Sequence, residues 1–191
     1  MISCTRSLLI LLLCSVPLLT KAQEGTGQVG IIYGPGHAYS VTAPEGWILD
    51  NQIGLRLGLP AVFYHSSKTW GTAQARMYVN TSAPDSGKTA DPLARAQADS
   101  IMFVHDNPGI RITVADTIRI SDKTYAIVRH FAGDRYGNFE AVAYVAEKTI
   151  IPQIVLTCRT KEAFDEALPA FKQLVRSYKW LGEAEVIPPV L

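Results

Sequence analysis

The sequence predicts one mixed α+β domain. Three observations support this fold class. Short β-prone segments recur between turn residues from position 38 to position 158, the last four of them are separated by hairpin-length connections, and two longer segments carry helical signatures. With 191 residues, 48% of them hydrophobic and 18% charged, the chain can bury a substantial core without metal or disulfides.

Residues 1–22 are predicted to be a secretory signal peptide. Arg6 precedes an apolar stretch of 12 residues, Leu8–Leu19, and the segment ends in small residues at Ala22. Crossing a bilayer takes about 20 apolar residues. We therefore expect export to the periplasm or the extracellular space, with no permanent membrane span after cleavage. Lipidation of Cys14 is the weaker alternative, because Leu13 stands where a small residue is usual.

The charge balance argues against nucleic acid as a partner. The full chain carries 18 Lys+Arg and 17 Asp+Glu, and loss of Arg6 and Lys21 with the leader would leave 16 basic residues against 17 acidic ones, a net charge of −1. Binding a polyanion usually needs a concentrated basic surface. Cleavage would also leave Cys158 as the one cysteine, and its apolar neighbours predict a buried thiol.

The N-terminal half is predicted to be rich in strands. Residues 23–36 contain five glycines and predict a flexible lead-in, because glycine loses much entropy when it is ordered. Alternation over residues 38–43 predicts a strand that ends in a turn at Pro44 and Gly46. Further strands are predicted at 47–49, 61–65 and 72–80.

Two helices are predicted. Asp91 as the N-cap and Pro92 at the first helical position begin a helix that ends near Asp106. The second helix covers about 160–177, and Pro169 is expected to kink it or to start a further helix. Its apolar stripe consists of Phe164, Leu168, Phe171, Val175 and Tyr178.

The segment between the two helices predicts an antiparallel meander. Strands are expected at 111–120, 124–132, 138–147 and 150–158, with short polar connections between them. After the second helix, residues 183–191 are predicted to form an extended C-terminal tail.

The sequence contains no motif that supports binding of a cofactor or a metal. Residues 25–30, GTGQVG, match the dinucleotide-binding fingerprint, but a cleavage site precedes them and β-prone residues follow, so the strand and helix that the fingerprint needs are missing. The four histidines form no short-spaced ligand pair. We expect neither a cofactor nor a bound metal.

Four residues on predicted loops are candidate contacts with a ligand or partner. His65, Lys68 and Trp70 lie at the end of strand 61–65 and in the loop that follows, and Tyr136 lies at the tip of hairpin 133–137. Loops on a rigid sheet often carry binding residues, and tryptophan is enriched at interface hot spots. Packing in the core is the alternative for Trp70.

The leading functional hypothesis is an exported, non-catalytic domain that binds another protein or a small ligand. The alternative is a secreted hydrolase with a site assembled from His65, His130, Asp134 and Glu140. Asp134 and Glu140 flank one hairpin and could form a carboxylate pair, although solvated turn charges are commoner. The hydroxyls that follow His65 are expected to have poor geometry for activation, because neighbouring strand residues face opposite sides.

Two segments, together with the late strands, resemble PsbP-like domains. They are Tyr39–Trp47, YSVTAPEGW, and Glu162–Tyr178, EAFDEALPAFKQLVRSY, and the resemblance covers residues 37–182. It implies an antiparallel sheet of about six to seven strands flanked by helices, an α/β/α sandwich. The family includes extrinsic subunits of photosystem II, a Ran-binding, Mog-type branch and exported bacterial proteins. The resemblance implies an exported bacterial member with an accessory role, and it assigns no site residue.

Overall fold

The computed structural model describes residues 27–84 and 89–183, and the helices and strands in these residues form an α+β fold. The predicted signal peptide, residues 1–22, lies outside the described residues, as does all of the predicted tail after Glu183. In chain order the elements are β1 (Val29–Gly34), β2 (His37–Thr42), β3 (Trp47–Leu49), α1 (Asn51–Leu57), β4 (Ala61–His65), β5 (Ala75–Ser82), α2 (Pro92–Asp106), β6 (Arg111–Arg119), β7 (Tyr125–Ala132), β8 (Phe139–Val145), β9 (Ile151–Cys158), α3 (Lys161–Arg176) and β10 (Lys179–Gly182).

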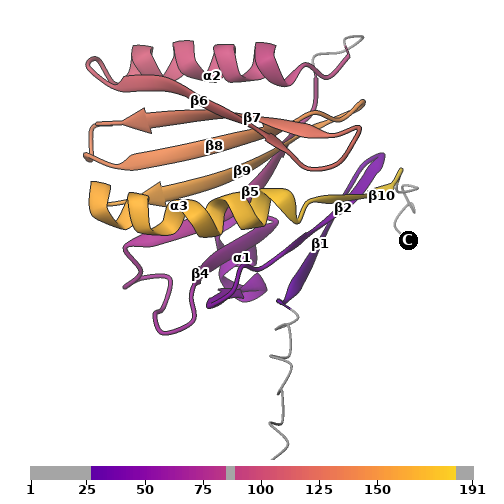
Figure 1. Ribbon diagram of the computed structural model, residues 1–191, viewed down its shortest axis with the longest axis horizontal. Helices are drawn as coiled ribbons and strands as arrows, with labels where there is room; N and C mark the ends of the chain where they lie inside the picture. Colours follow the sequence, from indigo (N-terminus) through magenta and orange to yellow (C-terminus); the bar gives the residue numbers. More distant parts are fainter. Residues whose placement is uncertain (1–26, 85–88, 184–191) are drawn as a thin grey trace, which may run out of the picture.

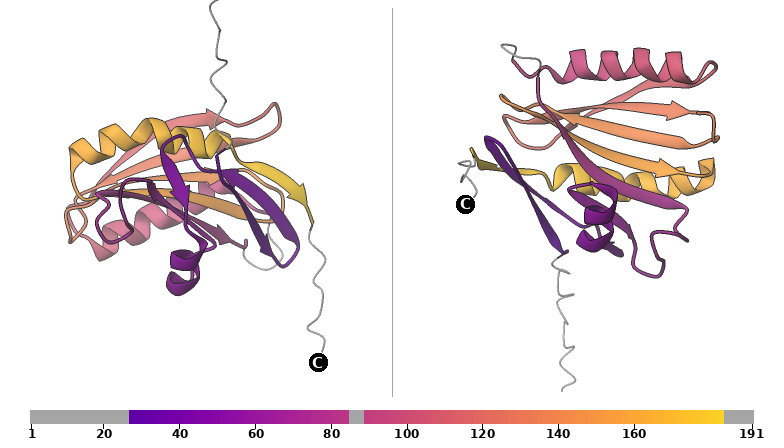
Figure 2. Two further views of the ribbon diagram at one scale, coloured as in Figure 1. Left: turned by 90° about the horizontal axis from the view of Figure 1, so that it is seen from below. Right: turned by 180° about the vertical axis from the view of Figure 1, so that it is seen from behind.

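Seven strands form one antiparallel sheet in the order β3-β4-β5-β9-β8-β7-β6. The predicted meander is confirmed, because β6, β7, β8 and β9 pair in sequence as hairpins. The sheet is completed where β9 pairs with β5 from Ala75↔Cys158 to Ser82↔Ile151. Helices α2 and α3 lie on opposite faces of this sheet (Figures 1 and 2), which confirms the α/β/α sandwich.

A second, three-stranded sheet, β1-β2-β10, lies beside the C-terminal end of α3 (Figure 1). The prediction of a flexible lead-in over residues 23–36 is therefore wrong for residues 29–34, which form β1. Ladder hydrogen bonds to β2 and burial of Ile32 offset the entropy that its glycines lose. A Cβ on Gly30 would stand 3.2 Å from a methyl carbon of Leu49, so this glycine permits close packing.

Helices α1 and α3 also differ from expectation. The sequence did not predict α1, although its Asp50 N-cap accepts a hydrogen bond from the Ile53 amide at 2.9 Å and Gly58 ends it at φ 68°. Helix α3 is one helix with Pro169 inside it, so of the two predicted alternatives, a kink or a further helix, the further helix is wrong. Pro169 lies on the exposed face, where water can reach the carbonyl group that lacks a donor.

The hydrophobic core is divided by the large sheet. The larger part lies under α3 and includes Phe63, Leu156 and Phe171, all fully buried. The smaller part lies under α2, which packs on β7 and β8 and covers Phe131 and Tyr144. On the α2 side, β5 and β9 carry polar side chains in addition to apolar ones, among them Arg76, Gln153 and Thr157.

Candidate functional site

The end of β4, the β4–β5 loop and the β7–β8 hairpin, which carry the four predicted contact residues, lie at one end of the large sheet, on the left in Figure 1. Strand β4 ends there at His65, and the pairs Ala75↔Cys158 and Phe139↔Cys158 place the adjacent ends of β5, β9 and β8 side by side. We call this region the loop end. It consists of the β4–β5 loop (66–74), the β7–β8 hairpin (133–138) and residues 159–160 before α3.

A cavity of about 410 Å³, the arginine pocket, opens at the loop end on the α2 side of the sheet. It brings β5, the β7–β8 hairpin and the end of β9 together around one space. Among the residues that the structure describes, no acidic side chain lines it. The polar lining comes from Gln74, Arg76, Tyr136, Asn138, Thr157 and Arg159.

The β4–β5 loop holds the Arg76 side chain in place. Arg76 Nε donates to the Trp70 carbonyl oxygen at 2.6 Å, and Nη2 donates to the Gly71 carbonyl oxygen at 3.2 Å. The guanidinium carbon lies 5.3 Å from the centre of the Trp70 ring, a cation–π distance. Trp70 in turn meets Tyr64 edge-on, with 6.3 Å between the ring centres. Trp70 thus supports Arg76 and does not itself line the pocket.

Arg76 and Arg159 face the same cavity without a matching carboxylate. Partial burial, and then the positive charge of Arg159, lower the pKa of Arg76. Within the described residues neither arginine forms an ion pair with an acidic side chain. The pocket therefore concentrates positive charge in a space that is partly removed from water.

Asp134 organises the hairpin that carries Tyr136. Its Oδ1 accepts hydrogen bonds from the amides of Tyr136 at 2.9 Å and Asn138 at 2.8 Å, and its Oδ2 accepts one from Asn138 Nδ2 at 3.0 Å. Arg135 stacks on the Tyr136 ring, with 5.0 Å between its guanidinium carbon and the ring centre. These bonds commit Asp134 to the turn.

A second cavity of about 370 Å³, the tryptophan pocket, lies at the loop end on the α3 side. Trp47 and alanines of α3 line it together with His65, Lys68 and Glu166. Gln74 lines both pockets. The predicted contacts are thus divided between two cavities, with His65 and Lys68 on one side of the sheet and Tyr136 on the other.

The residues of the alternative hydrolase hypothesis do not converge. His130 faces the α3 side, where its ring meets Phe164 edge-on at 5.1 Å, whereas Glu140 lines a cavity on the α2 side. The expectation of poor geometry at His65 is wrong in one respect, since the turn after β4 brings Ser67 Oγ to 2.8 Å from His65 Nδ1. Among the described residues, however, no carboxylate is hydrogen-bonded to His65.

Two further ionisable groups near the arginine pocket are strongly affected by burial. Burial raises the pKa of the Glu140 carboxyl; a hydrogen bond with the Thr157 side chain opposes this effect, and the negative charge of Asp134 adds to it. Burial also raises the pKa of the Cys158 thiol to about 12. The prediction of a buried cysteine is confirmed, because Cys158 is 1% exposed, and a thiol of such high pKa is a poor nucleophile at neutral pH.

Comparisons with known proteins identify the fold. No family model matches the chain, and neither does any curated protein sequence. The solution structure of cyanobacterial PsbP (CyanoP) from Synechocystis sp. PCC 6803 is similar, with a TM-score of 0.50 and 16% sequence identity over 87% of this chain and 100% of that chain. The chain has a PsbP-like fold.

A crystal structure from Bacteroides thetaiotaomicron VPI-5482 is also similar, with a TM-score of 0.49 and 12% identity over 85% of this chain and 52% of that chain. The PsbP-like fold confirms what residues 39–47 and 162–178 implied about architecture. At such sequence identities it carries over no functional residue.

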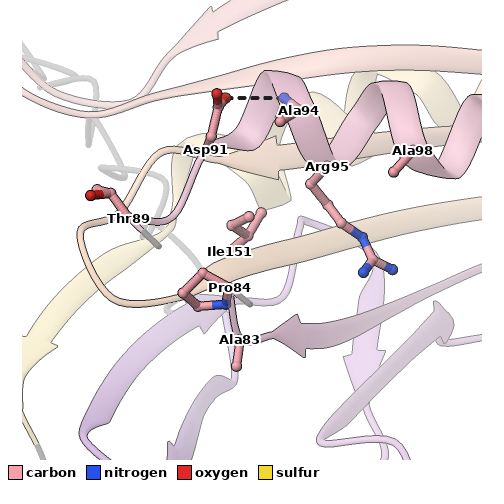
Figure 3. Close-up of a pocket in the computed structure, with 8 residues that line it drawn as sticks. All are labelled: Ala83, Pro84, Thr89, Asp91, Ala94, Arg95, Ala98 and Ile151. Atoms are coloured by element: carbon pink, nitrogen blue, oxygen red, sulfur yellow. Dashed lines mark hydrogen bonds between the residues drawn. The ribbon is translucent and has the colours of Figure 1, made fainter. Parts of the chain in front are cut away.

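A third cavity of the PsbP-like fold, of about 350 Å³, lies at the opposite end, between α2 and the end of β5 (Figure 3). Its two charged side chains, Asp91 and Arg95, have partners in the protein, although Arg95 Nε has none among the described residues. Asp91 Oδ1 accepts hydrogen bonds from the amides of Leu93 and Ala94, and Arg95 is paired with Asp99. The rest of the lining is mostly alanine, proline and isoleucine, so this cavity offers a ligand few free polar groups.

Arg95 belongs to a charge-matched network on the α2 side of the sheet. Its Nη2 lies 2.9 Å from Asp99 Oδ1, Gln153 Nε2 donates to Asp99 Oδ2 at 3.1 Å, and Ser82 Oγ donates to Gln153 Oε1 at 3.2 Å. Sequence reasoning missed this network. The spacing of Arg95 and Asp99, four residues apart in a predicted helix, was the available signal.

The PsbP-like fold shows no metal centre in the described ranges 27–84 and 89–183, where no three histidine, cysteine or acidic residues come together as ligands. The same ranges contain no helix that is both long enough and apolar enough to cross a bilayer.

Proposed function

We propose that this protein is an exported, non-catalytic accessory domain that binds a partner protein or a small ligand through its loop end. One observation carries the proposal. Residues chosen from the sequence as loop contacts gather at a single end of a rigid sheet, around two cavities that share Gln74. Binding sites are commonly built in this way, from loops that a stable scaffold positions.

Export rests on residues 1–22, with Arg6, the apolar stretch Leu8–Leu19 and the small residue Ala22. N-terminal sequencing of the protein recovered from the periplasm or medium of its native host tests this part. A mature chain that begins at Gln23 is the expected result. An intact Met1 on protein found only in the cytosol would contradict export.

A binding role is favoured over hydrolysis because the ionisable residues are dispersed. His130 and Glu140 lie on opposite faces of the sheet, and Asp134 is held by three N–H donors of its own hairpin. The fold similarity to cyanobacterial PsbP is consistent with an accessory role.

Site-specific crosslinking in the native host tests the binding surface. A photo-reactive amino acid is placed at Lys68 or Tyr136, and at Ile101 as a control on the outer surface of α2, where the side chain is 73% exposed. We expect adducts, of protein or small molecule as identified by mass, at the two loop-end positions and not at Ile101. Equal labelling at all three positions, or none at the loop end, would reject this surface.

The non-catalytic part is tested with the purified protein. We expect no turnover of a panel of ester, amide and glycoside substrates. Turnover at an ordinary enzymatic rate that His65→Ala, Ser67→Ala or Glu140→Ala abolishes would establish the hydrolase instead.

A further inference from the structure

We infer that the arginine pocket binds an oxyanion, the carboxylate or phosphate group of a small ligand, between Arg76 and Arg159. The inference rests on the proposed function, since it names a ligand class for one cavity of the loop end. It rests on the lining of that cavity, on the way Arg76 is held, and on the absence of an acidic side chain from the part of the lining that the structure describes.

Two arginines that share a cavity repel each other when no carboxylate lies between them, and none does among the described residues. Arg159 is exposed but Arg76 is half-buried, which makes the repulsion stronger than between two groups fully in water. Arg76 cannot easily turn away, because two loop carbonyls and the Trp70 ring hold its guanidinium. An oxyanion between the two arginines would relieve this repulsion: a carboxylate would balance one of the two positive charges and a phosphate dianion both. Arginine suits this role because its planar fork of N–H groups matches carboxylate and phosphate oxygens.

The remaining polar lining can hydrogen-bond the rest of such a ligand. Thr157 pairs with Arg76 in the ladder between β5 and β9, so the two side chains lie on the same face, where the Thr157 side chain is hydrogen-bonded to Glu140. Gln74 and Tyr136 line the cavity from two different loops. A volume of about 410 Å³ exceeds what a free phosphate ion fills and lies in the usual range for small-molecule sites.

The nearby carboxyl groups do not replace the ligand. Asp134 accepts three hydrogen bonds within its hairpin. Glu140 pairs with Thr157 across the ladder between β8 and β9, but it lines the neighbouring cavity of about 150 Å³, and burial raises its pKa, which disfavours the charged form. The positive charge of Arg76 and Arg159 therefore remains available to a bound anion.

The test is an NMR titration of the purified protein with inorganic phosphate and, separately, with acetate, in sodium chloride of matched ionic strength. We expect saturable shifts of the Arg76 Nε–H and of the Gln74 and Asn138 side-chain amides. Arg159→Gln should weaken the binding at least tenfold. Arg135→Gln is the matched control, because Arg135 stacks on Tyr136 at the same hairpin but does not line the pocket, and it should bind as the wild type does.

The two anions distinguish the sources of the oxyanion. Saturation by phosphate alone assigns a phosphorylated ligand, and saturation by acetate alone or by both assigns a carboxylate or a general oxyanion site. Shifts that do not saturate with either anion, or that persist unchanged in Arg159→Gln, would overturn the inference. If no anion binds but crosslinks still form at the loop end, the anion site is rejected and the proposed function is retained. If anions bind but no loop-end crosslinks form, the anion site is retained and the proposed function is rejected.

A stability measurement separates a binding role for Arg159 from a structural one. At low salt without phosphate, Arg159→Gln should be at least as stable as the wild type in urea, because the substitution relieves repulsion with Arg76. In millimolar phosphate the wild type should gain stability and the variant should not. A variant that is less stable than the wild type under both conditions would contradict the inference.

Discussion

Two arginine environments lie on the same side of the sheet and are built in opposite ways. At one, Arg95 of α2 is paired with Asp99, which also accepts a hydrogen bond from the buried Gln153. At the loop end, Arg76 and Arg159 share a cavity that no acidic side chain of residues 27–84 or 89–183 lines. In the first arrangement the charge of Arg95 is matched by Asp99, although Arg95 Nε has no hydrogen-bond partner among the described residues, whereas in the second the positive charge is unbalanced.

The two environments indicate which residues stabilise the fold and which are available for binding. A matched buried pair is costly to break, because removal of one partner leaves the other without compensation. Unmatched cations contribute little to folding, and they repel each other until an anion arrives. We therefore expect substitutions in the network to affect folding, and those in the arginine pocket to affect binding.

The largest effect is expected at the network. Asp99→Ala would leave the Arg95 guanidinium and the Gln153 amide without their acceptor, and should lower the free energy of unfolding by about 2 kcal/mol, less than for a fully buried pair because the Arg95 side chain is 37% exposed. Urea unfolding measures this loss. The matched control is Asp165→Ala, which removes the exposed pair of Lys161 and Asp165 and should cost less than about 0.5 kcal/mol. Equal losses of unfolding free energy in the two variants would show that the network contributes no more to folding than an exposed ion pair does.

A smaller loss is expected at the support of Arg76. Trp70→Ala removes the ring that stacks on the Arg76 guanidinium and packs against Tyr64, and should lower the free energy of unfolding by about 1 to 2 kcal/mol. The same variant should weaken phosphate binding in the NMR titration, because Arg76 loses its fixed orientation. Trp70→Phe, which keeps an aromatic face, should retain most of both properties. Wild-type binding by Trp70→Ala would show that this support is unnecessary.

An ionisable group on the other face of the sheet extends the comparison to pH. Burial, and then the positive charge of Lys172, lower the pKa of His130 below its ordinary value of 6.5. Below that pH the unfolded chain binds more protons at this position than the folded chain, so stability should fall as the pH drops from 7 toward 5. His130→Gln should lose this part of the pH dependence. Urea unfolding at several pH values measures it, and identical pH profiles of the two proteins would contradict the prediction.

The smallest effect is expected at the exposed tip of the hairpin. The Tyr136 side chain is 73% exposed, so Tyr136→Ala should change the free energy of unfolding by less than about 0.5 kcal/mol. Crosslinking from neighbouring loop-end positions should nevertheless decrease if this tip contacts a ligand or partner. A large loss of stability would mean that the tip is structural.

Prediction of the fold from sequence succeeded where the pattern is local. Helix α2 has its Asp91 cap and Pro92, α3 has a stripe of apolar residues, and β6 to β9 are separated by short polar turns. Prediction failed at β1 and β10, because each is held in place by pairing with β2. Glycines such as Gly30 indicate flexibility only when no neighbouring strand fills the space beside them.

The candidate site was predicted only in part, for a related reason. His65, Lys68, Trp70 and Tyr136 could be chosen because loop positions can be recognised from the local sequence. Arg76 was missed because it lies inside a strand, and Arg159 because it follows another strand far along the chain. Their shared cavity depends on the pairing of β5 with β9, which are not consecutive strands.

The sequence by itself determined the α+β class, the caps and stripes of the two long helices, the meander and the loop positions of the candidate contacts. These follow from steric and hydrogen-bonding preferences that act over a few neighbouring residues. Three features follow from tertiary structure alone: β5 lies beside β9, Asp99 is hydrogen-bonded to Gln153, and Arg76 and Arg159 line one cavity that no described carboxylate lines. The interaction of two charges depends on their distance in space, and for residues far apart in the chain that distance is fixed only when the sheet closes.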